Sequence, residues 1–254
     1  MTPRYPADLY AVTHTGTPGD LAFYRELCRS ADDVLELGCG YGRVLEALAP
    51  LPCRLVGVDS DADLLAQARQ RLAGYDDVTL IEADMRTVAL DRRFDRVLVP
   101  HSGIYCLPHE ADVLAVFRRA HALLRPGGIL ALDAYTADGF HEDAKVDDFD
   151  DHELLPVAHV HARGKAWRVL ERSHWDPAQQ RIVVTYVYRS EDGEAYDEGR
   201  IDQRYLLRPQ VLVLLREAGF VDIAMAGTFH GDPVHEDDEM WVVRAVATGT
   251  AGAR

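Results

Sequence analysis

The sequence predicts an α/β fold, with a parallel sheet between layers of helices and a small antiparallel β insert. From residue 20 to residue 137, short apolar runs alternate with segments of helical apolar spacing, which is the pattern of a parallel sheet with crossover helices. The pattern then changes to short alternating runs between turn signals, and returns after residue 207. We therefore expect three parts: an N-terminal arm at 1–19, an α/β domain at 20–137 and 208–247, and an inserted antiparallel β subdomain at 138–207.

The first part of the α/β domain is expected to alternate strands and helices. Asp20 is a suitable N-terminal cap for its first helix, and Ser60 or Asp61 for a later one that ends near Gly74. Helices are predicted at 20–28, 44–48, 62–73 and about 109–124, and buried-type strands at 34–37, 54–59, 78–85, 94–99 and 129–133.

The rest of the chain is expected to hold the insert and the closing strands. Residues 138–153 are dominated by Asp and Glu, and we interpret them as a solvated loop rather than as an attractor for a cationic substrate. The 1–19 arm, rich in Pro, Thr and Gly, is expected to be loop-like. Insert strands are predicted at 166–173, 181–189 and 199–207, followed by a helix at 209–219 and strands at 220–228 and 240–247.

The composition is that of an acidic globular protein, with a net charge of -15 and a pI of about 5.1. This charge argues against a nucleic-acid partner, because binding to a phosphate backbone depends on basic patches. The N-terminal residues lack the apolar run of a signal peptide, and no stretch approaches the ~20 apolar residues of a membrane helix. The four scattered cysteines form no Cys-x-x-Cys pair. We therefore expect a soluble, cytoplasmic protein without a membrane partner.

The motif that organises the chain is Glu36-Leu37-Gly38-Cys39-Gly40-Tyr41-Gly42, between a predicted strand and a predicted helix. Such a strand, glycine turn and helix place a ligand at the carboxyl edge of a sheet. The spacing is Gly-x-Gly-x-Gly, not the Gly-x-Gly-x-x-Gly of dinucleotide folds. A carboxylate at Glu36 would oppose a pyrophosphate and suits a cationic ligand better. S-adenosylmethionine (SAM) carries both a sulfonium and an ammonium group.

Acidic residues follow three successive predicted strands, as Glu36, Asp59 and Asp84. The carboxyl ends of parallel strands meet at one sheet edge, so these side chains are expected near one another. An acid after the second strand can bind a ribose diol through both oxygens, and one after the third can accept an adenine amino hydrogen beside Met85. Any one of them could equally be a helix cap or turn former, but three behind this glycine turn favour a nucleoside site.

The sequence resembles class I SAM-dependent methyltransferases over nearly the whole chain except the insert. The resemblance is carried by the glycine motif, by the acids after the second and third strands, and by three further motifs: Phe94-Asp95-Arg96-Val97, Leu123-Leu124-Arg125-Pro126-Gly127-Gly128 and Glu217-Ala218-Gly219-Phe220. The resemblance implies a Rossmann-like, seven-stranded methyltransferase sheet with helices on both faces and the antiparallel insert after its fifth strand. It implies that Gly38 and Gly40 approach the methionine part of SAM, that Asp59 holds the ribose, and that Asp84 and Met85 frame the adenine. The full set of implied SAM contacts is Tyr10, Glu36, Gly38, Cys39, Gly40, Gly42, Asp59, Ser60, Asp84, Met85, Val99 and Pro100.

Two further features are similar to the amine-methylating branch, which includes antibiotic-sugar N,N-dimethyltransferases and glycine N-methyltransferase-like enzymes. One is the arm Asp8-Leu9-Tyr10, in which Tyr10 stands at a position used to cover SAM. The other is the insert, which in such enzymes helps to wall the substrate site or forms a dimer contact. The resemblance implies methyl transfer to a small molecule, with an amine nitrogen favoured over a hydroxyl, and a homodimer as one possible assembly.

Methyl transfer requires the protein to align the nucleophile within ~3–3.5 Å of the methyl group, while the cofactor supplies the reactivity. A neutral amine needs no strong base, whereas a hydroxyl benefits from one. His101 directly follows Pro100 at the expected cofactor edge and is the first candidate for substrate contact or proton removal, with Tyr105 the second. The alternative for His101 is a ring that shapes the pocket wall.

A metal site is not expected. His159 and His161 would share one face of a strand, but no Cys or His-x-x-x-His partner accompanies them. We interpret them as solvated or pocket-lining residues.

Four other functions stay open at this point. They are O-methylation of a small molecule, a non-methylating reaction on SAM such as cyclisation of its side chain, a binding module without catalysis, and nucleic-acid methylation. The last is disfavoured by the acidic charge and because Pro100-His101-Ser102-Gly103 stands where an Asn/Asp-Pro-Pro-Tyr/Phe motif would be needed.

Overall fold

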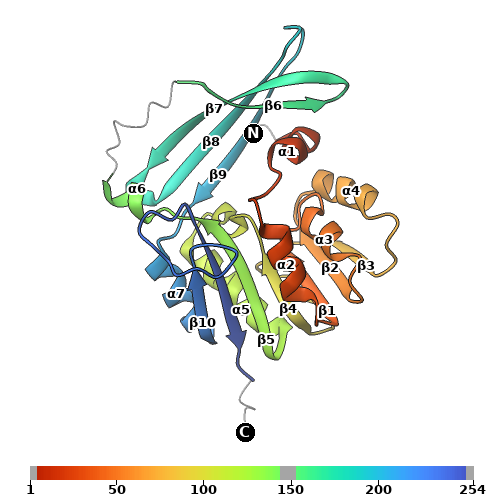
Figure 1. Cartoon of the computed structure of the whole chain (residues 1–254), viewed down its shortest axis with the longest axis vertical. Coiled ribbons are helices and arrows are strands. Elements are labelled where there is room, and N and C mark those ends of the chain that lie inside the picture. The colour runs from red at the N-terminus through yellow and green to blue at the C-terminus, as the bar shows by residue number, and fades with distance from the viewer. Residues whose placement is uncertain (1–4, 144–152, 250–254) are drawn as a thin grey trace.

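The computed structural model describes residues 5–143 and 153–249, which form two β-sheets (Figure 1). The larger sheet has seven strands in the order β10-β11-β5-β4-β1-β2-β3. Its neighbours β1 to β5 pair in parallel, and β11 pairs antiparallel with both β5 and β10. These strands are β1 (Asp33–Leu37), β2 (Arg54–Asp59), β3 (Val78–Glu82), β4 (Phe94–Val99), β5 (Leu124–Tyr135), β10 (Phe220–Ala226) and β11 (Met240–Ala247). The predicted α/β class with a seven-stranded sheet is confirmed.

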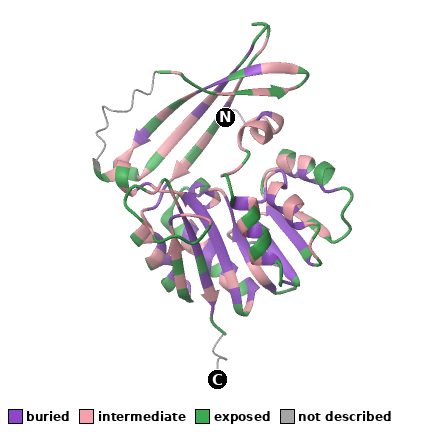
Figure 2. Ribbon diagram, viewed as in Figure 1, coloured by how far each residue is buried: buried purple, intermediate pink, exposed green. Residues whose placement is uncertain are grey.

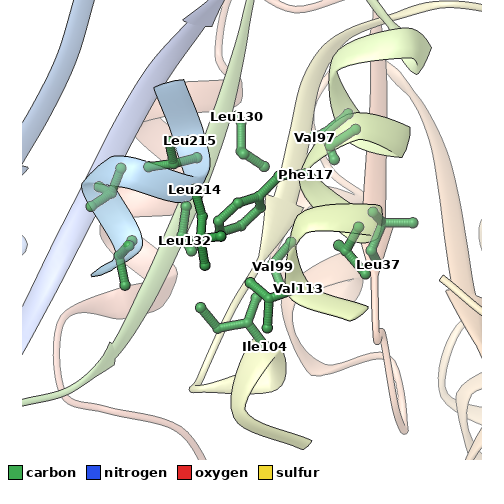
Figure 3. Close-up of a cluster of buried hydrophobic side chains, with 14 of the residues drawn as sticks. Leu37, Val97, Val99, Ile104, Val113, Phe117, Leu130, Leu132, Leu214 and Leu215 are labelled. Carbon is green, nitrogen blue, oxygen red and sulfur yellow. The ribbon is translucent and has the colours of Figure 1, made fainter. Parts of the chain in front are cut away.

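The central strands are buried on both faces, as Figure 2 shows, because helices cover the sheet on either side. The helices are α2 (Asp20–Cys28), α3 (Arg43–Leu48), α4 (Ala62–Arg71), α5 (Glu110–Leu123) and α7 (Arg208–Glu217). On one face, Phe117 of α5 packs against Leu132 of β5 and Leu214 of α7 (Figure 3). This packing fixes the strands whose carboxyl ends carry the site.

A second, antiparallel sheet has four strands in the order β6-β7-β8-β9 and lies across one end of the larger sheet (Figure 1). Three of them match the predicted insert strands: β7 (Lys165–Asp176), β8 (Arg181–Ser190) and β9 (Tyr196–Arg204). The fourth, β6 (Leu155–Ala162), was not among the predicted strands. It is an edge strand that pairs with β7, and its alternating Ala158, Val160 and Ala162 pack against the cluster around Trp167.

The expectation of a loop-like arm was wrong for its central residues, which form α1 (Ala7–Thr13). So short a helix is marginal by itself, and tertiary contacts stabilise it. Leu9 is fully buried with Trp167 and Tyr188 of the four-stranded sheet, and Arg163 donates two hydrogen bonds to the Asp8 carboxylate.

The predicted solvated loop at 138–153 is also partly helical. Its first residues form α6 (Asp138–Asp143), and Arg208 makes an ion pair with Asp138. Residues 144–152 of this stretch, including Lys145, lie outside the described residues. No helix in the described part of the chain is both long and apolar enough to cross a membrane, and the four cysteines are free thiols.

Candidate active site

A cavity of about 690 Å³ lies where the glycine turn, the N-terminal arm and the four-stranded sheet meet. The carboxyl ends of β1, β2 and β4 therefore face the insert. Residues of the expected SAM motifs line one side of the cavity: Glu36, Gly38, Cys39, Gly40, Asp59, Ser60, Met85, Pro100 and His101. Residues of the arm and the insert line the other sides, including Tyr5, Tyr10, His14, Glu171, Ser173, Tyr186 and Gln203.

The glycine turn bends sharply between β1 and α3. The backbone N–H groups of Gly38 and Cys39 both donate to the carbonyl oxygen of Val58, at 2.8 and 3.0 Å. Gly40 has a φ of +51°, in the left-handed region that favours glycine, and no atom would contact a Cβ there within 4 Å. The turn thus presents bare backbone to the cavity, which allows close approach of a ligand.

Asp59 joins this turn to the loop that follows β2. One of its carboxylate oxygens accepts the Gly40 N–H at 2.7 Å, and the other accepts the Asp61 N–H at 2.8 Å. Burial raises the pKa of the Asp59 carboxyl. Asp61 caps α4 by accepting the N–H groups of Asp63 and Leu64, as one of the two predicted caps. Asp59 therefore has both a structural role and an acceptor position at the cavity wall.

Glu36 is almost fully buried, and its Oε2 atom has no hydrogen-bond partner among the described residues. Burial raises the pKa of its carboxyl to about 8, while Arg43 opposes this rise. At neutral pH the group therefore holds a proton. A buried carboxyl with one unpaired oxygen on the cavity wall fits the ammonium group of SAM, because a cation there would stabilise the ionised form.

We expect SAM binding to release up to one proton at pH 7, and its dissociation constant to fall as the pH rises towards about 8. The reason is that the raised pKa of Glu36 must drop when a cation binds beside it. Calorimetric titrations in two buffers of different ionisation enthalpy measure this release. Glu36→Gln should abolish it, and equal heats for the native protein in both buffers would contradict the role of Glu36.

The same shift affects the protein without SAM. Because the folded state binds a proton that the unfolded chain has lost, the contribution of Glu36 to stability falls as the pH rises from about 4.5 to about 8.

Arg43, the first residue of α3, connects the glycine turn to the arm. Its guanidinium donates two hydrogen bonds to the carboxylate of Asp20, at 3.1 and 2.6 Å, and both side chains are largely buried. A Cβ on Gly16 would lie 2.2 Å from the Arg43 Cζ atom, so the arm packs directly on this ion pair. Asp20 was predicted to cap α2, but no side-chain cap bond forms there; its carboxylate serves the ion pair instead.

His101 lines the cavity, as predicted for a residue beside the cofactor edge. His101 and Ser102 both have left-handed backbone, with φ values of +52° and +57°, which is uncommon outside glycine. The buried Asp133 holds this turn, since its carboxylate accepts the His101 N–H at 3.1 Å and a hydroxyl hydrogen bond from Tyr24. Burial lowers the pKa of the His101 imidazole and raises that of Asp133 to about 6.

Tyr105, the second catalytic candidate, does not reach the cavity. Its side chain is fully buried, and its hydroxyl donates to the carbonyl oxygens of Tyr135 and Leu206. The hydroxyl therefore has no position from which to contact a substrate. Tyr105 lies in the short 3₁₀ helix η1 (Gly103–Cys106) that follows β4, and its side chain turns into the core.

The other predicted SAM contacts divide into those at the cavity wall and those behind it. Tyr10, Cys39, Ser60, Met85 and Pro100 line the cavity. Gly42, Asp84 and Val99 are outside its lining.

Asp84 instead accepts several hydrogen bonds from Arg86, which also bonds Asp112 of α5. The predicted contact of Asp84 with adenine would therefore require it to share its carboxylate with this arginine.

Several cavity residues had no signal in the sequence. His14 and Tyr5 belong to the arm, and the Tyr5 hydroxyl lies 2.9 Å from the His14 Nε2 atom and 2.6 Å from the Tyr188 hydroxyl. Glu171 and Tyr186 come from the insert. Period-two alternation could have placed these two on one face of the insert, but not opposite the glycine turn.

Residues 34–128 match the family model described as a methyltransferase domain. The chain is 31% identical over 137 residues to the dTDP-3-amino-3,6-dideoxy-α-D-glucopyranose N,N-dimethyltransferase of Streptomyces fradiae, covering 51% of this chain and 52% of that protein. It is 33% identical over 163 residues to the carboxy-S-adenosyl-L-methionine synthase of Geobacter metallireducens, covering 59% and 60%. The chain thus spans little more than half the length of these curated relatives.

A solved structure agrees over most of the chain. SAM-bound CalS10, an amino pentose methyltransferase of Micromonospora echinaspora, superposes with a TM-score of 0.68 at 23% identity, covering 90% of each chain. At that identity the likeness concerns the fold. Together with the seven-stranded sheet and the glycine turn, it shows that the chain has the Rossmann-like methyltransferase fold, with a methyltransferase domain at residues 34–128. S-adenosyl-L-methionine is the cofactor that this domain indicates.

Proposed function

We propose that this protein transfers a methyl group from SAM to an amine nitrogen of a small molecule. The observation that carries this proposal is the continuity of the cavity: one space joins the SAM motifs to a second wall built by the arm and the insert. A donor and an acceptor can therefore lie in contact inside it. The Streptomyces fradiae relative, named for an amino-sugar substrate, supports a small amine as acceptor.

SAM, when bound, supplies an electrophilic methyl group on a sulfonium. The residues of this chain bind and orient the reactants. Asp59 holds the ribose, Glu36 stabilises the ammonium group, and Tyr10 closes over the cofactor from the arm. The chemistry of the histidines favours nitrogen over oxygen as the acceptor. Burial lowers the pKa of His14 to about 4 and also lowers that of His101, so both rings are neutral and weakly basic. Such rings can accept a hydrogen bond from an amine, but they activate a hydroxyl poorly.

The test is incubation of the purified protein with SAM and dTDP-3-amino-3,6-dideoxy-α-D-glucopyranose, alongside a panel of simple amines and phenols, read by mass spectrometry. We expect S-adenosylhomocysteine and an amine product heavier by one or two methyl groups. Methylation of phenols alone would overturn the preference for nitrogen.

The likeness to a carboxy-SAM synthase supports a second candidate, a non-methylating reaction on SAM itself. Loss of SAM to a different SAM-derived product, without S-adenosylhomocysteine, would establish that reaction in place of methyl transfer.

A further inference from the structure

Three polar side chains lie together on the insert wall of the cavity. Glu171 and Ser173 are on β7, and Tyr186 stands directly opposite Glu171 on β8. Burial and the neighbouring Glu171 carboxylate raise the pKa of the Tyr186 hydroxyl, and the Ser173 hydroxyl lies 3.4 Å from the Glu171 Oε1 atom. Because side chains alternate between the two faces of a strand, all three point to the face of the sheet that lines the cavity.

Glu171 has no ion-pair partner among the described residues, 5–143 and 153–249. None of the basic side chains in these ranges forms a salt bridge with its carboxylate. It is also the one carboxylate among the insert residues that line the cavity. Arg200, the cation on that wall, lies 4.0 Å from Asp202 on its own strand. Glu171 therefore presents a negative charge to whatever fills the acceptor side.

The carboxylates on the cofactor side are already engaged. Asp59 and Asp61 accept backbone N–H groups, and the pKa of Glu36 is raised to about 8. These groups belong to the turns that hold SAM. A cationic acceptor would thus meet its free carboxylate partner at Glu171.

Edge-to-face and tilted ring contacts connect Tyr186, the neighbour of Glu171, to the cofactor side of the cavity. The Tyr186 ring lies 4.9 Å from the His14 ring, and His14 lies 4.5 Å from Tyr10. Tyr5 packs closely against β9, because a Cβ on Gly199 would lie 2.5 Å from its ring. The path from Glu171 to Tyr10 is therefore lined by aromatic and neutral side chains.

We propose that Glu171, supported by Tyr186 and Ser173, forms a subsite that captures the amino group of the methyl acceptor as an ammonium ion and selects amines over neutral hydroxyl compounds. The nitrogen attacks the methyl group of SAM only in its neutral form, after the ammonium has returned its proton to solvent. The inference rests on the proposed function and adds to it the residue that sets the preference. Glu171 acts by binding, and its contribution is to affinity for the acceptor.

The test is steady-state kinetics of Glu171→Gln with dTDP-3-amino-3,6-dideoxy-α-D-glucopyranose as acceptor and dTDP-6-deoxy-α-D-glucopyranose as its hydroxyl counterpart. We expect KM for the amine to rise about 10- to 100-fold, the range of a hydrogen bond to a charged group. The turnover number and the inhibition constant of the hydroxyl compound should change less than about threefold. Glu198→Gln is the matched control, because Glu198 is a carboxylate on the opposite face of the same sheet, bonded to Tyr196. It should leave all three constants unchanged.

A second measurement needs no acceptor. Sinefungin carries an amine in place of the sulfonium methyl group of SAM, so it places a cation at the acceptor side. We expect Glu171→Gln to weaken sinefungin binding about threefold or more relative to S-adenosylhomocysteine, and Glu198→Gln not to.

The outcomes separate the two proposals. Suppose that the native protein methylates amines. If Glu171→Gln then changes KM for the amine and the inhibition constant of the hydroxyl compound by the same factor, or changes neither constant, the subsite is overturned and the proposed function stands. If the native protein methylates no amine, the proposed function fails. The affinity for sinefungin relative to S-adenosylhomocysteine then decides the subsite. If Glu171→Gln leaves this relative affinity unchanged, the subsite is overturned as well; if Glu171→Gln reduces it, the subsite is supported as a cation site.

Discussion

Asp59→Ala is expected to weaken SAM binding at least about 100-fold. The substitution removes the carboxylate that we propose for the ribose diol, and it also releases the Gly40 N–H that Asp59 accepts at 2.7 Å. Hydrogen bonds to a charged group contribute about 1.5–3 kcal/mol each. The loss of the two hydrogen bonds proposed between the carboxylate and the ribose diol therefore corresponds to about 3 kcal/mol or more of binding free energy. Calorimetric titration with SAM and with S-adenosylhomocysteine measures the change.

Asp95→Ala is the matched control for that experiment. Asp95 also accepts two backbone N–H groups, from Asp32 and Asp33 at 2.9 and 3.0 Å, but it does not line the cavity. It should lower the melting temperature and leave SAM affinity nearly unchanged. If Asp59→Ala binds SAM as tightly as the native protein does, Asp59 does not hold the ribose.

Asp20→Ala is expected to lower the free energy of unfolding by about 3–5 kcal/mol. Asp20 is 3% exposed and pairs through both oxygens with Arg43. Removing one partner leaves a largely buried guanidinium without its counterion, which costs about that much. Chemical denaturation with urea measures the loss. Because the arm packs on this pair at Gly16, proteolysis of the arm should also become faster.

An exposed ion pair supplies the comparison for Asp20. Glu217 and Arg118 are 3.0 Å apart with side chains that are 51% and 59% exposed, and such pairs contribute about 0–1 kcal/mol. Glu217→Ala should therefore change the free energy of unfolding by less than about 1 kcal/mol. Equal losses for the two substitutions would show that burial of the Asp20–Arg43 pair adds nothing.

The strands of the larger sheet could be predicted from the sequence because each is a short apolar run bounded by turn residues. β2, β4 and β11 begin and end where they were expected. β5 begins at Leu124, before the predicted start at 129, because pairing with β4 extends the strand back through Pro126 and the two glycines. Local pattern thus located the strands, and pairing with neighbours set their limits.

The sequence by itself determined the cavity wall that carries the predicted SAM motifs. The glycine turn, the acids at the ends of β1 and β2, and the residues around Pro100 follow one another in a pattern with a local physical reason. The tertiary structure alone decided the acceptor side. His14 and Glu171 are far apart in the chain and meet only because α1 packs its Leu9 against the four-stranded sheet. Tertiary packing also directed the Tyr105 side chain into the core and paired Asp20 with Arg43. Such choices depend on which surfaces are buried together, and a local pattern carries no information about a partner from a distant segment.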